Sequence, residues 1–370
     1  MLRIYANRFL LMGLISLISL MANIALSKDA ISSDKNIGEI AAQHAKSYKL
    51  DARTREKLVK EISETMLINY VFEEVAQEMG NDLKRRLSNG EYDAIEDAGE
   101  LARKLTKDLR DVSHDQHIEV ILWEDKVEAE PTSEEREKRR EEAKQYARLR
   151  NSGIQKYELQ DGNIGLLELN EFINKEFAEP TIVSTMALAS NSDALIFDLR
   201  KSRGGDPETV ALICSFLLGG EKVHLNDMYF RRINLTNSYW TEPQAKNLRI
   251  PNDKPVYVLT SRQTFSAAEE FAYDLQSLGR AIIIGERTRG GAHFVNRFQL
   301  NESFAMYTPI ARPINPITKT NWEGAGVIPN IEVPVGDALK EAKKHALRYM
   351  IEREQNLDRK SKLKQSLEQL

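Results

Sequence analysis

Residues 256–286 read VYVLTSRQTFSAAEEFAYDLQSLGRAIIIGE and decide the fold of this chain. The apolar run at 256–260 is typical of a buried strand, residues 267–278 have helical periodicity, and 281–286 predict a second strand. A strand, a helix and a strand in this order form a βαβ unit with parallel strands and a right-handed crossover. Ser266 lies where the first strand turns into the helix.

The same alternation of strands and helices continues on both sides of this stretch. It predicts an α/β domain over residues 163–336, followed by a polar helical tail over 337–370. The other predicted strands are IGLLELN at 164–170 and ALIFDLR at 194–200, and the other predicted helices run through 184–189 and 208–218.

The residues before this domain follow a helical pattern. Apolar residues recur at three-to-four spacing between Leu58 and Met79, which predicts a helical N-terminal domain over residues 28–123. The alternation at 117–123 indicates a strand that leaves this domain. Residues 124–162 are rich in Glu, Lys and Arg of both signs and predict a solvated helical connector.

The overall charge and the cysteine content argue against nucleic-acid binding, internal disulfides and cysteine catalysis. Lys and Arg number 52 against 56 Asp and Glu, a net charge of -4, so no basic field predicts a nucleic-acid partner. Cys214 is the only cysteine, so no disulfide can form within the chain. Its apolar context, VALICSFLL, indicates a core side chain. Burial there raises the pKa of the thiol, so Cys214 is a poor candidate for a nucleophile.

Residues 1–27 resemble a targeting segment. Arg3 and Arg8 precede an apolar stretch that ends in Ala25-Leu26-Ser27, the pattern of a secretory signal peptide. The alternative is an uncleaved membrane anchor, because the apolar stretch approaches the length of a spanning helix. Either reading predicts a periplasmic or secreted protein whose contact with the membrane is made only through this segment.

Ser266 has two interpretations on pattern alone. It could be an N-cap with Glu269 at the third helical position, a capping box. It could also be a nucleophile, with the Ala267 N–H at the helix start as a donor to an oxyanion. Gly204-Gly205, which follows a predicted strand, is either an ordinary turn or the source of a second oxyanion donor.

A serine nucleophile requires a base and an orienting carboxylate. His114 and His117 lie where the helical domain gives way to a strand, and His293 follows a strand of the α/β domain. Glu323, in a glycine-flanked loop, is the candidate carboxylate. His114 and His117 have no third metal ligand at the spacing of a known metal motif, so neither a metal nor another cofactor is expected.

Several segments together resemble a known family. In order along the chain they are similar to the tail-specific (C-terminal processing) serine peptidase superfamily, nearest to the branch of interphotoreceptor retinoid-binding protein modules and bacterial relatives, with the tricorn protease core more distant. The resemblance extends from about Val59 to Leu339. The segments are VSHDQHIEV (112–120), NIGLLELNEF (163–172), ALIFDLRKSRGGDP (194–207), VYVLTSRQTFSAAEEFAYDLQ (256–276), RAIIIGERTRGGAHF (280–294) and ARPINPITKTNWEGAGVIPNIEV (311–333).

This resemblance implies a helical N-terminal domain joined to a spiral βαβ domain of the ClpP/crotonase type. It places Ser266 on the nucleophile, His117 on the histidine and Glu323 on the acidic residue. The oxyanion hole falls on the Ala267 N–H and a glycine of Gly204-Gly205. Residues 124–162 are too short and too charged for a PDZ domain, so none is expected.

The sequence also departs from the family pattern. Gly291 stands where the Ser-Lys branch has its lysine, so the mechanism must use histidine. In the tricorn type the histidine follows a serine, and here Ser113 precedes His114 whereas Gln116 precedes His117. The base therefore stays open between His114 and His117.

Two functions fit these observations. The first is a secreted or periplasmic serine peptidase acting on peptides or proteins. The alternative is an inactive protein of the same fold that binds a small apolar ligand of the lipid or retinoid type, since fold alone does not settle function.

Overall fold

The computed structural model describes residues 50–123 and 132–370, so the predicted signal segment at 1–27 lies outside the described residues. The chain forms two compact units, and neither is a single continuous stretch. Among the described residues, no helix combines the length and apolar character needed to cross a membrane. Of the described residues, the first unit comprises 50–123, 132–141, 230–234 and 293–311, and the second comprises 142–229, 235–292 and 312–370.

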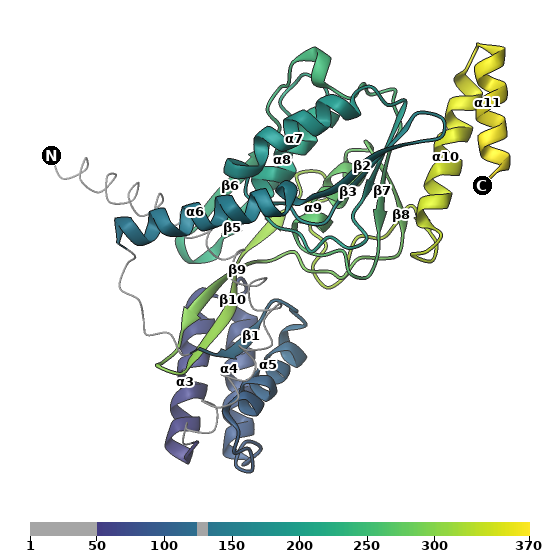
Figure 1. Ribbon diagram of the computed structural model, residues 1–370. Helices are drawn as coiled ribbons and strands as arrows, with labels where there is room; N and C mark the ends of the chain where they lie inside the picture. Colours follow the sequence, from purple (N-terminus) through teal and green to yellow (C-terminus); the bar gives the residue numbers. More distant parts are fainter. Residues whose placement is uncertain (1–49, 124–131) are drawn as a thin grey trace. The chain divides into compact units, whose positions relative to one another are not determined.

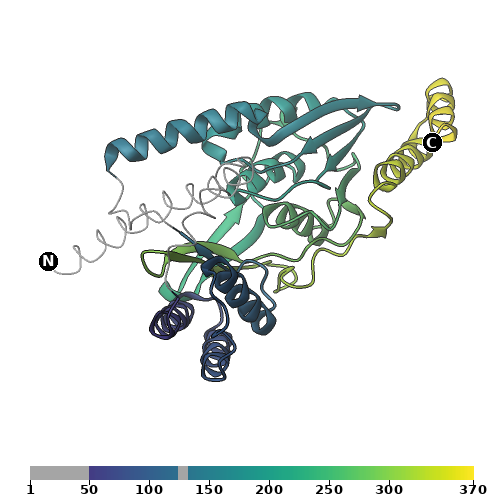
Figure 2. The same cartoon turned by 60° about the horizontal axis from the view of Figure 1, so that its bottom comes forward.

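The first unit is built on three helices, α3 (Ala52–Asn69), α4 (Glu73–Ser88) and α5 (Ala98–Ser113). They lie next to one another in sequence order (Figure 2). Asp51 and Asp97 cap α3 and α5 by accepting the N–H groups of Thr54 and Glu100, which satisfies donors that the helices leave unpaired. The buried apolar faces include Leu58, Ile62, Met66, Met79, Leu83, Leu101 and Leu105.

Strands from distant parts of the sequence complete this unit. β1 (Glu119–Leu122) pairs antiparallel with β10 (Phe304–Ile314), with Glu119 opposite Tyr307. β10 also pairs antiparallel with β9 (Phe294–Gln299). The sequence predicted β1 but neither β9 nor β10. The 3-10 helix η2 (Arg231–Ile233) belongs to the same unit.

The second unit contains a six-stranded sheet in the order β11-β8-β7-β4-β3-β2. Every neighbouring pair is parallel except β2 and β3, which form an antiparallel hairpin. The strands are β2 (Ile154–Gln160), β3 (Ile164–Leu169), β4 (Ala194–Asp198), β7 (Val256–Thr260), β8 (Ile282–Gly285) and β11 (Ile331–Glu332).

Both faces of this sheet are covered by helices, as its apolar strands require. Leu195 and Phe197 of β4 point into one core with α7 (Lys175–Ala189), α8 (Pro207–Leu217) and α9 (Ala267–Ser277). Ala194 and Ile196 point into the opposite core, against α10 (Ala338–Arg353). Figure 1 shows α7 and α8 on one side of the sheet and α10 on the other.

The remaining elements come before, between and after these strands and helices in the sequence. α6 (Ser133–Leu149) and η1 (Asn151–Gly153) lead into β2, and no PDZ-like domain occurs within residues 132–163. β5 (His224–Phe230), β6 (Leu235–Trp240) and η3 (Lys246–Leu248) follow α8, and α11 (Leu357–Glu368) packs on α10. The predicted fold class, a helical N-terminal region and an α/β domain, is confirmed.

Candidate active site

Ser266 occupies a strained turn between β7 and α9. Its backbone has φ 56° and ψ −128°, outside the left-handed helical region that His114, for example, adopts with φ 57° and ψ 12°. Ordinary caps in this chain, such as Asp97, have extended backbone with φ −90° and ψ 127°. A non-glycine residue in so sparsely populated a conformation costs about 1–3 kcal/mol and persists only where its surroundings enforce it.

The loop that follows β4 enforces this turn. The Thr264 hydroxyl donates to the Leu199 carbonyl oxygen at 2.9 Å, and the Phe265 N–H donates to the Ser202 carbonyl oxygen at 3.2 Å. The Ser261 hydroxyl donates to the carbonyl oxygen of Arg200. These hydrogen bonds therefore join the two loops that follow the neighbouring strands β4 and β7. The carboxyl ends of strands, where these loops lie, are where open α/β sheets bind ligands.

Gly204 lies directly against the serine. It has φ +94°, and a Cβ atom added there would come within 2.8 Å of the Ser266 Cβ and 2.7 Å of the Ala267 nitrogen. Only glycine fits so close an approach, which answers why the sequence has a glycine pair at this turn. Gly205, with φ +140°, allows a similarly close approach to the Phe172 carbonyl oxygen.

Backbone pairing fixes the direction of the Gly205 N–H. Phe172 donates to the Gly204 carbonyl oxygen at 2.8 Å and accepts the Asp206 N–H at 2.7 Å, so the Gly205 N–H faces away from Phe172. Ala267 is the first residue of α9, where an N–H has no acceptor within its own helix. N–H groups placed like these two can stabilise an oxyanion.

Glu269 is a buried carboxylate beside the serine. Its Oε2 atom accepts the Ser266 N–H at 3.0 Å, the carboxylate half of the capping box that the sequence suggested. The same carboxylate accepts N–H groups from Gly290 and Gly291 and the Thr288 hydroxyl. Burial raises the pKa of Glu269 to about 7 against the opposing effect of these donors.

Glu323 is hydrogen-bonded to the residue that follows Gly291 in the same loop. Its Oε2 atom accepts the Ala292 N–H at 2.6 Å, and its own N–H donates to Asn321 Oδ1 at 2.9 Å. The neighbouring Trp322 donates its indole N–H to the Gly291 carbonyl oxygen at 2.9 Å. The half-buried Glu323 is thus fixed to the segment that leads into His293.

The first unit holds a second group of ionisable residues around Asp115, which is 1% exposed. Asp115 contacts His293 Nδ1 at 2.6 Å and His117 Nδ1 at 3.3 Å, and it accepts the Tyr70 hydroxyl at 3.2 Å. Burial alone would raise its pKa, but hydrogen bonds from His117 and His293 hold the pKa of Asp115 well below its usual range. A carboxylate on the Nδ1 side of an imidazole orients the ring and fixes its tautomer.

His114 and His117 differ in their surroundings. His114 is exposed and forms the left-handed C-cap of α5. His117 is 4% exposed and is held by Asp115 through both its ring and its backbone N–H. The sequence did not suggest Asp115, although its spacing of two residues from His117 was a visible signal.

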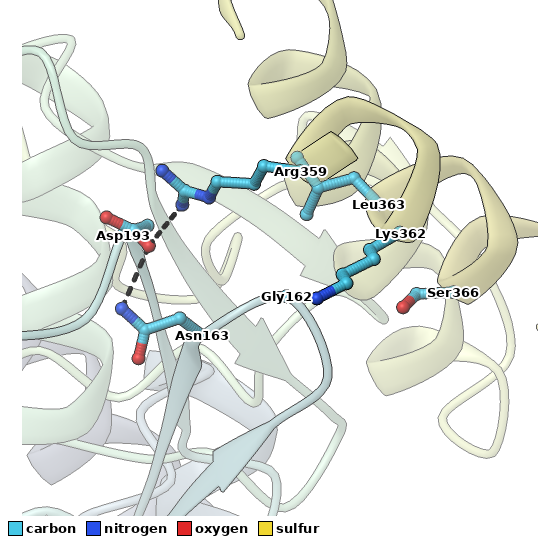
Figure 3. A pocket seen from close by; sticks show the side chains of 7 residues that line it. All are labelled: Gly162, Asn163, Asp193, Arg359, Lys362, Leu363 and Ser366. Carbon is cyan, nitrogen blue, oxygen red and sulfur yellow. Dashed lines mark hydrogen bonds and ion pairs between the residues drawn. The ribbon is translucent and has the colours of Figure 1, made fainter. Parts of the chain in front are cut away.

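A separate hollow of about 410 Å³ lies between the β2–β3 turn and α11 (Figure 3). Arg359 forms an ion pair with Asp193, and the Asn163 side-chain amide donates to the same carboxylate at 2.8 Å. None of the residues that line this hollow belongs to the group around Ser266. Its contacts fasten α11 to the sheet.

Comparison with known families identifies the class of protein. Residues 163–333 match the model of peptidase family S41, and residues 46–151 match the model of the N-terminal domain of this family in eukaryotic interphotoreceptor retinoid-binding protein. The chain belongs to the peptidase S41 family. The resemblance stated from the sequence is confirmed.

Individual relatives match parts of the chain. A carboxyl-terminal-processing protease of Picosynechococcus sp. is 26% identical over 171 residues, which cover 46% of this chain and 39% of that protein. A tail-specific protease of Haemophilus influenzae is 37% identical over 100 residues, 27% of this chain and 13% of that protein. The chain thus spans well under half the length of these curated relatives.

A solved structure from Parabacteroides merdae covers more of the chain. It has a TM-score of 0.53 at 19% identity and covers 77% of this chain and 92% of its own. At this identity the likeness concerns the fold alone.

Proposed function

We propose that this chain is a serine peptidase with Ser266 as its nucleophile. The observation that carries the proposal is the backbone of Ser266, held at φ 56° and ψ −128° in a strand-to-helix turn with Gly204 against it. A helix cap has no need of this strained conformation, whereas a nucleophile at such a turn presents its hydroxyl above the sheet edge. Membership in the S41 family supports the same assignment.

In the proposed reaction, the Ser266 hydroxyl oxygen attacks the carbonyl carbon of a peptide bond while His117 takes the hydroxyl proton. The carbonyl oxygen becomes an oxyanion and accepts N–H groups from Ala267 and from Gly204 or Gly205, each worth about 3 kcal/mol. The carbon–nitrogen bond then breaks, and His117 gives its proton to the leaving amine. Water hydrolyses the resulting ester as His117 accepts the water proton and returns a proton to Ser266.

His117 is preferred to His114 as the base because it is buried and its Nδ1 side faces Asp115. Asp115 would accept the Nδ1–H and stabilise the imidazolium, which leaves Nε2 to exchange the proton. Glu323 remains the proposed acidic residue, and its hydrogen bond to the Ala292 N–H supports a fixed position for it.

The proposed substrates are peptides or proteins. The support is the family and the names of the matched relatives, a carboxyl-terminal-processing and a tail-specific protease. We further propose that residues 1–27 direct the chain out of the cytoplasm. Fractionation of cells that express the full chain, compared with a chain lacking residues 1–27, tests this.

The nucleophile is tested by labelling with a fluorophosphonate probe. We expect the wild-type protein to be labelled covalently and Ser266→Ala to show no labelling and no turnover, with an unchanged thermal unfolding midpoint. Labelling that persists in Ser266→Ala would refute the assignment.

The base is tested with a matched pair of histidine variants. His117→Ala should reduce the labelling rate by about 1,000-fold, within the usual range for loss of a general base, whereas His114→Ala should stay within about threefold of wild type. An equal loss in both variants would show that the choice of His117 is wrong.

A further inference from the structure

The carboxylate of Glu269 joins two segments that are far apart in the sequence. One donor, the Ser266 N–H at 3.0 Å, comes from the turn that carries the proposed nucleophile. The others come from the loop after β8: the Gly290 N–H at 2.7 Å, the Gly291 N–H at 2.9 Å and the Thr288 hydroxyl. Glu269 itself is 0% exposed.

These contacts match an ionised carboxylate. The two oxygens of a carboxylate offer about four acceptor sites, and four donors occupy them here. All four partners are neutral N–H or O–H groups, and the start of α9 adds a favourable helix dipole. Because burial raises the pKa of Glu269 to about 7, the matched, ionised form is established above neutral pH.

The loop that Glu269 holds is fastened on its other side as well. The Thr288 hydroxyl accepts the Val327 N–H at 2.6 Å while donating to Glu269, and the Gly290 carbonyl oxygen accepts the Gly324 N–H at 2.9 Å. Displacing the Glu269 carboxylate would therefore remove the link between the Ser266 N–H and this loop. The hydrogen bond from the Arg289 N–H to the Thr264 carbonyl oxygen, at 3.1 Å, would remain as a connection two residues before Ser266.

We propose that Glu269 is a positioning residue of the site: its carboxylate holds Ser266 in its strained conformation and fixes the loop 288–291 against it. This inference rests on the proposed function, because it assigns Glu269 a role in presenting the nucleophile. Glu269 touches no reacting atom and acts through the Ser266 backbone.

Glu269→Gln tests the proposal with almost no change in volume. An amide replaces one acceptor oxygen by an NH₂ donor, which then faces donors that have no other acceptor. Glu270→Gln is the matched control, since Glu270 is the next residue on the same helix, is 3% exposed, and bonds Asn226 instead of Ser266.

Steady-state kinetics on a peptide substrate should be measured at about pH 8, with thermal unfolding in parallel. We expect Glu269→Gln to lower kcat by about 100-fold with KM within about twofold, the signature of a misplaced nucleophile, and Glu270→Gln to stay within about twofold in both. Thr288→Val, which removes one of the four donors, should lower kcat by about tenfold and serves if Glu269→Gln fails to fold.

Amide hydrogen exchange supplies a measurement that needs no activity. Peptides covering residues 262–268 and 287–293 should exchange about tenfold faster in Glu269→Gln than in Glu270→Gln, with other segments unchanged. Unchanged exchange together with wild-type kcat would overturn the positioning role. Equal losses in the two Gln variants, in proportion to their unfolding midpoints, would overturn it too.

Failure of the proposed function gives a different result. If the wild-type protein is not labelled by a fluorophosphonate, Ser266 is not a nucleophile, yet the exchange experiment still decides whether Glu269 holds the turn. If wild type is labelled and Glu269→Gln is labelled at the same rate, only the positioning role is wrong.

Discussion

Two helices of the second unit begin at the carboxyl ends of neighbouring parallel strands, and the cap residues that precede them are held in opposite ways. At α8, after β4, Asp206 has extended backbone with φ −87° and ψ 121°, and its side chain accepts the Glu208 N–H at 2.9 Å. At α9, after β7, Ser266 has φ 56° and ψ −128°, and its own N–H donates to the helix residue Glu269.

The difference shows how one position in a fold can serve either stability or reactivity. At α8 the cap side chain turns to the helix and satisfies it, as caps ordinarily do. At α9 the helix supplies the hydrogen bond to the cap residue, and the strained backbone is enforced from outside by the loop at Gly204. The following predictions test that contrast, beginning with the largest expected effect.

Gly204→Ala should damage the α9 start most. The new Cβ would lie 2.7 Å from both the Ala267 nitrogen and the Phe265 carbonyl oxygen at φ +94°, so the backbone must shift. We expect a labelling rate about 100-fold lower and an unfolding free energy about 3 kcal/mol lower. Gly279→Ala is the control, with φ +65° and no heavy atom within 4 Å of the added Cβ.

The control should cost about 1 kcal/mol of stability and leave labelling unchanged. Wild-type labelling in Gly204→Ala would mean that the close approach of this glycine has no part in the reaction.

Asp206→Ala should affect stability and spare reactivity. The Asp206 carboxylate accepts the Glu208 N–H and, at 3.0 Å, the Lys175 N–H, so its loss leaves two donors unpaired. Chemical denaturation should show an unfolding free energy about 1–2 kcal/mol lower, with the labelling rate within about threefold of wild type. Asp206→Asn, which retains a capping oxygen, should lose less. A fall in labelling as large as that of Gly204→Ala would erase the contrast between the two helix starts.

The smallest effect concerns two other buried carboxyls of α9, Glu270 and Asp274. Burial raises the pKa of Glu270 to about 8 and that of Asp274 well above its usual value, and for Asp274 the neighbouring Glu270 adds to the shift. A group whose pKa is higher in the folded than in the unfolded state stabilises the protein below its unfolded pKa. That stability is lost as the pH rises through the folded pKa.

The unfolding free energy should therefore fall between about pH 4.5 and pH 8. Asp274→Asn should flatten this fall and be about 1–2 kcal/mol more stable than wild type at pH 8, as measured by urea denaturation across pH. The exposed Asp161→Asn should reproduce the wild-type curve. Identical curves for Asp274→Asn and wild type would show that this carboxyl does not titrate against stability.

Much of the fold followed from local patterns in the sequence. The apolar runs at 194–200 and 256–260, each followed by a helical pattern, predicted β4–α8 and β7–α9 because periodicity reports burial directly. β9 was missed because every residue of it is half-buried, so it has no clear inside-outside alternation. The predicted single stretch at 163–336 also gave no sign that residues 293–311 group with the first unit.

The candidate site likewise contains residues that the sequence indicated and one that only the structure showed. Ser266 and Gly204-Gly205 were visible because a small or hydroxylated residue at a strand-to-helix junction has few roles. Asp115 was not suggested, since its importance lies in Tyr70 and His293, residues 45 and 178 positions away.

By itself the sequence determined where the main strands and helices of the second unit lie, and therefore which residues stand at the strand ends. This is possible because the spacing of apolar residues along a strand or helix reflects burial within a few residues. Only the tertiary structure decided how those residues are used. Ser266 is strained because Gly204 lies directly against it and the carboxylate of Glu269 accepts its backbone N–H. That carboxylate is in turn held by the N–H groups of Gly290 and Gly291. Asp206 keeps the extended backbone of an ordinary cap. Such contacts depend on how the loops converge in space, and no local pattern encodes that.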